Sequence, residues 1–384
     1  MVDPTAPISL DTQFHIGIMS GTSMDGIDGV ICEFNKSGKP ILICHNSIEI
    51  SSSLKSQLMS LQHHGTNELH REALAANDLA KHYARLVHSL LDQSGMKASQ
   101  IKAIGAHGQT IRHQPQLHDE TGYTIQSLNP SLLAELTMID VVADFRSRDI
   151  AAKGQGAPLV PSFHAFQFSS PTKRAILNLG GIANLTLLDP TQPILGFDTG
   201  PGNVLLDMWI LQSLNLPFDN KGEWAQSGKL IKPLLKQLLQ EPFFSMRPPK
   251  STGRDLFNEM WLSPQLTPFL SSETPHDIQA TLLALTVESI INDLKIYFKD
   301  CTELIVCGGG VQNTYLISTM AKRLTEELPR VKLSSSDIFG VHPQTVEAMA
   351  FAWLSWSFFA KHAANIPEVT GALGPRILGA HYPN

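Results

Sequence analysis

The sequence predicts an α/β protein made of two halves that share one repeated pattern. In this pattern an apolar, strand-like segment ends in a loop of small residues, and a helix is expected to follow. The pattern occurs at residues 17–28, 196–203 and 306–313. Because ligands of such sheets bind where strands end and loops open, the recurrence predicts two α/β domains on either side of a ligand cleft.

In the first half, segments with strand periodicity are mixed with segments of helical periodicity. A strand is interrupted at His107, which glycines flank. Asn129 is expected to cap the helix that follows it, with Pro130 at the first helical position. The expected strands are 14–32, 40–50, 101–113 and 140–145, and the expected helices are 53–95 and 129–139.

A loop rich in glycine and proline at 150–161 separates the two halves. Such a stretch carries little strand or helix signal, so a domain boundary is expected close to it. The first domain is therefore predicted to contain 14–145 plus 346–384, and the second to contain 146–345. In the rest of the chain we expect a hairpin at 174–188, strands at 194–200 and 303–307, and helices from Val204, at 277–299 and at 346–363.

Composition excludes several classes of protein. The 384 residues carry a net charge of −6 without a basic block, so nucleic acid is not an expected partner. No apolar run reaches the length of a membrane span, and the first residues lack the regions of a signal peptide. The four cysteines form no CxxC pair and no HExxH motif occurs, so reduced thiols are expected and a zinc site is not. We therefore predict a cytoplasmic, globular protein.

The segment 16-IGIMSGTSMDGIDGV-30 has the composition of a phosphate-binding loop. It matches neither GxxxxGK[ST] nor GxGxxG. Glycines let backbone N–H groups approach an anion, and successive N–H groups at a helix start form an anion site. Asp25 and Asp28 cannot bind phosphate directly, but they can hold Mg²⁺ through water. The alternative is an ordinary strand-to-helix turn with two surface acids.

Asp198 stands at the end of a predicted strand, between the glycines of 196-GFDTGPGN-203. A carboxylate that is partly desolvated in this way can act as a general base. The alternative is a side chain that caps the turn. The glycines of 307-CGGGVQN-313 leave room for a purine or ribose, with Asn313 as a polar contact, although a tight strand-to-helix turn explains them as well.

Five further polar residues are candidates for binding a sugar or phosphate. His107 and Gln109 could contact such a ligand, or His107 could be a buried structural histidine. Arg146 and Asp149 could line a site or simply pair on the surface. Glu347 lies on an otherwise apolar helix, where it needs a partner, either within the fold or from a substrate.

Taken in order, eight segments resemble the anhydro-N-acetylmuramic acid kinase family over almost the whole chain, from Ile16 to the C-terminus. They are GIMSGTSMDGID, GAHGQTIRH, VVADFRSRDIAAKGQGAPLVP, NLGGIANLT, GFDTGPGNVLLDMW, PKSTGRDLFN, CGGGVQN and EAMAFAWL. The resemblance implies the fold of sugar kinases, actin and Hsp70, with two ribonuclease-H-like α/β domains flanking a nucleotide-binding cleft. It also suggests a homodimer.

The resemblance implies an ATP- and Mg²⁺-dependent reaction in murein recycling. Water opens the 1,6-anhydro bond of 1,6-anhydro-N-acetylmuramic acid while O6 accepts a phosphoryl group, which gives N-acetylmuramic acid 6-phosphate. Asp198 matches the catalytic aspartate of the family, and Glu347 matches a position that holds the sugar. The expected ATP-binding residues are Gly21, Thr22, Ser23, Met24, Asp25, Gly26, Ile27, Asp28, Gly308, Gly309, Gly310 and Asn313; the expected sugar-binding residues are Glu347, His107, Gln109, Arg146 and Asp149.

The sequence departs from the family pattern at Lys153, where glycine is usual, and at 125-IQSLN-129. Neither departure touches the phosphate loop or Asp198, so they bear on the sugar cleft alone. Two alternatives remain: a kinase of another amino sugar without ring opening, and a non-catalytic nucleotide switch of the same fold. A serine hydrolase is excluded because no GxSxG elbow is present.

Overall fold

The structure, a computed structural model, describes residues 12–21, 24 and 26–384. The chain divides into two compact units, with boundaries between Gln167 and Phe168 and between Gln344 and Thr345. Unit 1 contains the residues before the first boundary and those after the second. Unit 2, the residues between the two boundaries, is continuous in sequence.

The first boundary lies just before the last residue of a helix that the sequence analysis did not predict. Helix α5 spans Val160–Phe168, within and beyond the expected loop. Its Phe163 and Phe166 rings lie 6.0 and 5.3 Å from the ring of Trp353, which belongs to unit 1. This aromatic packing keeps α5 with unit 1, so the first domain extends beyond residue 145, where the sequence analysis ended it.

Unit 1 is built on a six-stranded sheet of order β13-β7-β4-β1-β2-β3. Strands β1, β2 and β3 are antiparallel neighbours, and β4 and β7 continue the sheet parallel to β1. The two-stranded sheet β5-β6 is separate. The strands are β1 (Gln13–Ser20), β2 (Ile27–Phe34), β3 (Pro40–Ile48), β4 (Ile101–Ala106), β5 (Gln109–Pro115), β6 (Gly122–Ser127), β7 (Val141–Ala143) and β13 (Ala380–Tyr382).

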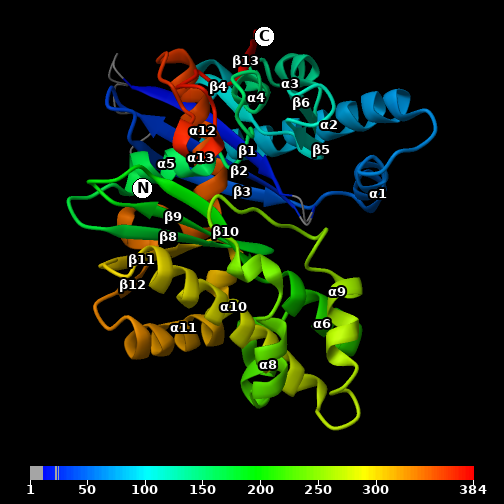
Figure 1. Ribbon diagram of the computed structural model, residues 1–384. Coiled ribbons are helices and arrows are strands. Elements are labelled where there is room, and N and C mark those ends of the chain that lie inside the picture. The colour runs from blue at the N-terminus through cyan, green and yellow to red at the C-terminus, as the bar shows by residue number, and fades with distance from the viewer. Residues whose placement is uncertain (1–11, 22–23, 25) are drawn as a thin grey trace. The chain divides into compact units, whose positions relative to one another are not determined.

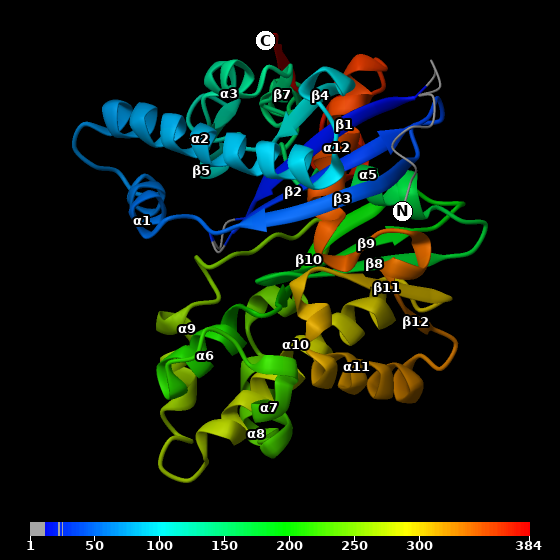
Figure 2. The same cartoon turned by 180° about the vertical axis from the view of Figure 1, so that it is seen from behind.

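Helices cover both faces of this sheet (Figures 1 and 2). Gly29 faces Leu86 of α2, and Gly17 faces the backbone of Ala348 in α12. In the β1–β2 ladder Gly29 is aligned with Ile18, the neighbour of Gly17. Aligned residues share a face of the sheet and neighbours in a strand alternate, so Gly17 and Gly29 lie on opposite faces. Helices α12 and α2 therefore cover opposite faces. The helices are α1 (Ser52–Ser60), α2 (Glu68–Ser94), α3 (Pro130–Thr137), α4 (Ser147–Ile150), α5, α12 (Val346–Phe359) and α13 (Pro367–Thr370).

Unit 2 contains a five-stranded sheet of order β10-β9-β8-β11-β12. Strands β8, β9 and β10 are antiparallel, and β11 and β12 are parallel to β8. The strands are β8 (Arg174–Leu179), β9 (Ile182–Leu188), β10 (Leu195–Pro201), β11 (Glu303–Cys307) and β12 (Lys332–Ser335). The helices are α6 (Val204–Leu214), α7 (Glu223–Ser227), α8 (Lys232–Leu238), α9 (Glu259–Leu266), α10 (Pro275–Tyr297) and α11 (Thr314–Glu327).

The two sheets share one connectivity. Reading β3-β2-β1-β4-β7 in unit 1 against β10-β9-β8-β11-β12 in unit 2 gives the same order, with three antiparallel strands followed by two parallel ones. This is the ribonuclease-H-like arrangement. The predicted α/β class with two such domains is therefore confirmed, although the sequences of the halves show no long repeat.

The loop after β1 leads into a strand, as the expected strand segment 14–32 implies. The helix that the strand–loop–helix pattern predicted after 17–28 does not form. β1 and β2 form an antiparallel pair in which Ser20 is aligned with Ile27. Ile27, Val30 and Ile31 of β2 are 0% exposed, so the apolar side chains of this segment are buried by the sheet and the helices that pack on it. The other two predicted strand–loop–helix units are confirmed, since α6 follows β10 and α11 follows β11.

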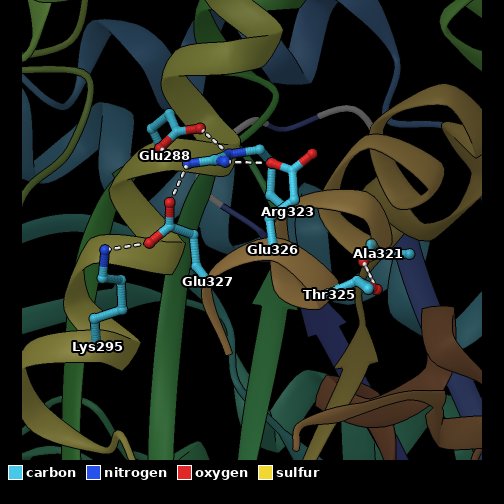
Figure 3. Close-up of polar contacts among 7 residues, drawn as sticks. All are labelled: Glu288, Lys295, Ala321, Arg323, Thr325, Glu326 and Glu327. Carbon is cyan, nitrogen blue, oxygen red and sulfur yellow. Dashed lines mark hydrogen bonds and ion pairs between the residues drawn. The ribbon is translucent and has the colours of Figure 1, made fainter. Parts of the chain in front are cut away.

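An ion-pair network joins α10 and α11 on the surface of unit 2 (Figure 3). Arg323 donates to both carboxylate oxygens of Glu288, over 2.6 and 3.1 Å, and it also pairs with Glu326 and Glu327. Lys295 pairs with Glu327. The Arg323–Glu288 and Lys295–Glu327 pairs link the two helices, and the other two pairs lie within α11. None of the helices in the described part of the chain has the length and apolar character needed to cross a membrane.

Two buried histidines make the stability of unit 1 sensitive to acid. Burial, with a smaller effect of Lys102, lowers the pKa of His15 to about 3, and burial lowers the pKa of His164 to about 3. In the unfolded chain a histidine has a pKa of about 6.5. Between these values the unfolded state binds more protons, so stability is complete above about pH 6.5 and is lost as the pH falls.

We expect each of these histidines to lower the free energy of unfolding by about 1.4 kcal/mol per pH unit below about pH 6.5. Urea unfolding at several pH values measures this slope. His15→Asn should reduce the slope, because one buried titrating group is removed, whereas His63→Asn, at an exposed position, should not. An unchanged slope in His15→Asn would contradict the prediction.

Candidate functional site

The described residues of the β1–β2 loop offer backbone groups rather than side chains. Met24 and Ile27 are 2% and 0% exposed, because their side chains pack in the core of unit 1. The Met24 N–H donates to the Gly21 carbonyl over 3.1 Å and closes a tight turn. Because the Met24 amide is engaged in this way, a phosphate contact would use other main-chain amides of the loop. Thr22, Ser23 and Asp25, also predicted to bind ATP or metal, lie outside the described residues.

Asp28 lies on β2 next to this loop and is exposed, unlike its buried neighbours Ile27 and Gly29. Desolvation by its neighbours raises the pKa of Asp28, and a hydrogen bond from Ser47 and the charge of His45 oppose the rise. In the described part of the chain, no cluster of three or more ligand-type side chains could hold a metal ion. One carboxylate suits Mg²⁺ nevertheless, since Mg²⁺ usually binds one or two carboxylates together with water and substrate phosphate.

The β1–β2 loop is tied to the segment that follows β4. Ser20 is 1% exposed, and its hydroxyl donates to the Gly108 carbonyl over 3.2 Å and accepts from the Tyr83 hydroxyl at 2.9 Å. Gln109, fully buried, donates from Nε2 to the Gly21 carbonyl over 3.2 Å. Its Oε1 has no hydrogen-bond partner among the described residues. The predicted sugar-binding and phosphate-binding segments are therefore in direct contact within unit 1.

His107 is a neutral hydrogen-bond acceptor. Its Nε2 accepts from Nε and Nη2 of Arg146 at 3.1 and 2.9 Å. Burial, followed by the positive charge of Arg146, holds the pKa of His107 well below its usual value. Because Nε2 accepts two hydrogen bonds, the single ring proton is assigned to Nδ1. His107 cannot serve as a cation for phosphate in this arrangement.

Arg146 donates to His107 and also feels the charge of Glu347. Its Nη1 donates to the Gly156 carbonyl over 2.8 Å. Burial lowers the pKa of Arg146 to about 10, and the negative charge of Glu347 works in the opposite direction. Glu347 is half-buried in the first turn of α12. The structure therefore brings together three residues that the sequence analysis had selected separately.

Asp149 is satisfied within the fold. Its side chain is 0% exposed, and its Oδ2 accepts from the Gly156 N–H at 2.8 Å. Its Oδ1 accepts from Asn365 Nδ2 at 2.7 Å and from Thr370 Oγ1 at 2.8 Å. With both oxygens occupied, Asp149 orders the loop that also receives Arg146. We propose this indirect role in place of the sugar contact expected from the sequence.

In unit 2, Asp198 lies on β10 at a break in register between Asp198 and Gly200. Its Oδ2 accepts from Ser251 Oγ at 3.0 Å and from the Thr252 N–H at 2.9 Å. No described residue donates to Oδ1, so this oxygen is available to a ligand. Desolvation raises the pKa of Asp198, opposed by the Thr252 and Ser251 hydrogen bonds and by the charge of Lys250. A half-buried carboxylate of raised pKa suits a general base.

The turn from β10 into α6 has no free amides for an anion. The N–H groups of Gly202 and Val204 donate to the Gly181 carbonyl over 2.9 and 3.0 Å, and the Asn203 N–H donates to the Gly180 carbonyl over 2.9 Å. A Cβ on Gly202 would lie 2.3 Å from the Gly180 oxygen, so glycine is required for this close approach. This loop therefore positions Asp198 rather than binding phosphate.

The three glycines after β11 have different surroundings. Gly308 has φ of 86°, and a Cβ there would lie 2.4 Å from Asn178 Oδ1; a Cβ on Gly310 would lie 2.7 Å from Leu179 Cβ. Gly309 has nothing within 4 Å of such a Cβ, so its backbone faces open space. Asn313 instead caps α11, because its Oδ1 accepts from the Leu316 N–H at 3.0 Å.

Ser251 and Thr252 are the residues next to Asp198 that the sequence analysis did not assign. It included the segment 250–254 only as part of the family motif PKSTGRDLFN. Asp198 and Ser251 are 53 positions apart, and their hydrogen bond depends on how the chain returns to β10. The only available signal was that both segments occur among the family motifs.

Comparison with known proteins agrees with this arrangement of motifs. The sequence profile of the family described as "Anhydro-N-acetylmuramic acid kinase" matches residues 13–384. A relative of that description from Albidiferax ferrireducens is 49% identical, covering 97% of this chain and 100% of its own length. Another from Cupriavidus pinatubonensis is 50% identical, covering 96% of this chain and 98% of its own. On this evidence the chain belongs to the anhydro-N-acetylmuramic acid kinase family.

Proposed function

We propose that this protein is an ATP-dependent kinase of 1,6-anhydro-N-acetylmuramic acid that acts in the recycling of murein. Water adds to the anomeric carbon, the bond from that carbon to O6 breaks, and O6 takes the γ-phosphoryl group of ATP. The products are N-acetylmuramic acid 6-phosphate and ADP. Family membership over residues 13–384 supports this proposal, and the geometry of Asp198 is the observation that carries the mechanism.

Asp198 is the proposed general base. The Ser251 hydroxyl and Thr252 amide hold Oδ2, so Oδ1 is the oxygen that takes a proton from the attacking water. The raised pKa of the carboxyl group makes it a better proton acceptor than an exposed aspartate. A nearby carboxylate also stabilises the positive charge that develops on the sugar ring as the glycosidic bond breaks.

The backbone amides of Gly21, Gly26 and Ile27 are proposed to bind the phosphates of ATP, together with Thr22 and Ser23. Asp25 and Asp28 would hold Mg²⁺ through water. When bound, Mg²⁺ neutralises charge on the phosphate oxygens during transfer. In unit 2 the open backbone at Gly309 is proposed to contact the nucleoside part.

The proposed sugar contacts are Glu347, His107, Gln109 and Arg146. Arg146 supplies a positive charge, Glu347 a negative one, and His107 a neutral ring. Gln109 adds Oε1, which no described residue satisfies. A site with acceptors and donors in this mixture suits a sugar that carries hydroxyl groups and a carboxylate.

If Gly309 contacts the nucleotide, a substitution there should weaken ATP binding without lowering the stability of the protein. Gly309→Ala should leave the melting temperature unchanged, because its Cβ would meet nothing within 4 Å. It should raise the KM for ATP by about tenfold, as expected when a contact of about 1.4 kcal/mol is lost. Gly308→Ala is the contrasting variant and should lose stability, since its φ is 86° and its Cβ would clash with Asn178. An unchanged KM for ATP in Gly309→Ala would remove this residue from the nucleotide site.

Mass spectrometry of one reaction tests the proposed function. The protein is mixed with ATP, Mg²⁺ and 1,6-anhydro-N-acetylmuramic acid in ¹⁸O-labelled water. We expect a product that has gained one phosphoryl group and one labelled oxygen at the anomeric carbon. Phosphate gain without labelled oxygen would indicate a sugar kinase that leaves the ring closed. No turnover by folded protein would favour another amino sugar or a nucleotide switch.

The oligomeric state and the location of the protein in the cell also belong to the proposal. We propose that it is a homodimer and that it acts in the cytoplasm, where ATP is available. Light scattering after size-exclusion chromatography tests the first statement, and fractionation of cells tests the second. A monomeric mass would overturn the homodimer without affecting the proposed reaction.

A further inference from the structure

We propose that a buried ion pair between Lys250 and Asp293 positions the proposed catalytic base Asp198. The pair anchors the segment 250–252, in which Ser251 and Thr252 hold one oxygen of the Asp198 carboxylate. Lys250 and Asp293 are therefore positioning residues, because they act through Ser251 and Thr252. This inference rests on the proposed function only in naming Asp198 as the base.

Lys250 is buried although the chain around it is exposed. Met246, Arg247 and Ser251 are exposed, whereas Lys250 is 4% exposed as a residue and 0% exposed in its side chain. Its Nζ lies 3.1 and 3.0 Å from the two carboxylate oxygens of Asp293 on α10. Charged side chains are almost never buried to this extent unless they are paired.

The surroundings of the pair are aromatic. The Lys250 ammonium lies 5.1 Å from the centre of the Phe243 ring and 5.7 Å from that of Phe197, the residue directly before Asp198. A cation at such distances is attracted by the rings. The ammonium group therefore points into unit 2, and Lys250 is not the phosphate-binding lysine that the sequence 250-KSTGR-254 resembles.

Three consecutive residues of the anchored segment hydrogen-bond to Asp198. The Lys250 carbonyl accepts from the Asp198 N–H at 3.0 Å, which fixes the backbone. Ser251 Oγ and the Thr252 N–H then donate to Oδ2 over 3.0 and 2.9 Å. All the side-chain bonds to described residues are on Oδ2, so the anchor decides which way Oδ1 points.

The charge of Lys250 acts on Asp198, Asp293 pairs with Lys250, and Tyr297 and Arg247 lie beyond Asp293. Burial raises the pKa of Asp293 to about 6, against the opposing charge of Lys250. Removing Lys250 alone would leave a buried acid without its partner and confuse positioning with folding. The informative change replaces both members with apolar residues of similar size.

Two variants test the inference. Lys250→Met/Asp293→Leu removes the anchor without leaving a buried charge, and Ser251→Ala removes one donor to Oδ2 at an exposed position. The matched control for the pair is Lys295→Met/Glu327→Leu, which removes another ion pair of α10, together with the Arg323–Glu327 pair, away from Asp198 (Figure 3). The control for Ser251→Ala is Ser245→Ala, whose hydroxyl donates to the Pro242 carbonyl and to no other described residue.

The first readout is the pH profile of turnover by the full-length protein with ATP, Mg²⁺ and the anhydro sugar. In Ser251→Ala we expect kcat to fall by about tenfold, the effect of a hydrogen bond to a charged group, with both KM values within about twofold of the original. The fall of kcat at acid pH should begin about one unit higher, because Asp198 loses a bond to its ionised form. The double variant should change in the same direction and by more, and both controls should match the original protein.

The second readout needs no substrate. In protein labelled with ¹³C-aspartate, the carboxyl signal that is missing from Asp198→Asn belongs to Asp198, and its titration midpoint can be followed by NMR. We expect the midpoint to rise in Ser251→Ala and in the double variant and to stay in place in both controls. If the original protein fails to turn over the sugar, the proposed function fails while this titration still decides the role of the anchor.

One result would overturn the inference. That result is a folded Ser251→Ala and a folded double variant that both keep the original kcat, the original fall of kcat at acid pH and the original titration midpoint of Asp198. A lower melting temperature alone in the double variant would also count against it, because the pair would then serve stability only. Should the double variant not fold, Ser251→Ala decides between the two outcomes.

Discussion

Replacing Asp198 by asparagine should lower kcat at least about 10²-fold, because asparagine cannot take a proton from the attacking water. The exchange preserves the shape of the side chain and its ability to accept from Ser251 and Thr252. We therefore expect the fold and the KM for ATP to change little. Steady-state kinetics with ADP detection, together with a thermal melt, measure both expectations.

The matched control for this variant is Asp300→Asn, the same exchange at an exposed position of unit 2. It should leave kcat unchanged. Because the pKa of Asp198 is raised, kcat of the original protein should decline as the pH falls through that raised value, where the base becomes protonated. Folded Asp198→Asn with near-normal turnover would remove Asp198 from the mechanism.

A methyl group on Gly17 should lower the free energy of unfolding of unit 1 by about 3 kcal/mol, at the upper end of the usual cost of overpacking. The Cβ of Gly17→Ala would lie 1.9 Å from the Ala348 oxygen and 2.4 Å from the Ala352 nitrogen. Both atoms belong to the backbone of α12, which cannot yield as a flexible side chain does. Gly105→Ala should behave similarly, with its Cβ 2.0 Å from the Phe351 oxygen.

Urea unfolding of these variants measures the change. Gly374→Ala is the control in the same unit, because the nearest atom to its Cβ is the Arg376 guanidinium, at 3.4 Å, on a flexible side chain. It should stay within about 0.5 kcal/mol of the original protein, as surface substitutions usually do. If Gly17→Ala proved as stable as Gly374→Ala, α12 would not lie against β1 as described.

Local sequence signals predicted the elements that have their own caps and periodicity. Asn129 caps α3, as expected, with its Oδ1 accepting from the Leu132 N–H at 3.0 Å. The loop after β1 was misread because small residues and aspartates suit a turn into a strand as well as a turn into a helix. Helix α5 was missed because the glycines and prolines just before it dominated the reading of that segment.

The site was predictable as a set of motifs but not as a set of contacts. Asp149 and Asn313 carry the expected residue types, yet the fold uses one to bind distant loops and the other as a helix cap. The partners of Asp149 lie 216 and 221 positions away, so no local pattern announces them. The same limit applies to Lys250, whose burial depends on where α10 passes.

The division of unit 1 between the two ends of the chain has a consequence for translation. While the chain is being made, strands β1 to β4 leave the ribosome long before α12, which covers β1 in the finished protein. Unit 2 is complete in the meantime, since it lies between the two parts, and it can fold first. The apolar face of the nascent sheet must therefore stay uncovered for the whole synthesis of unit 2, which is when it is open to chaperones and to aggregation.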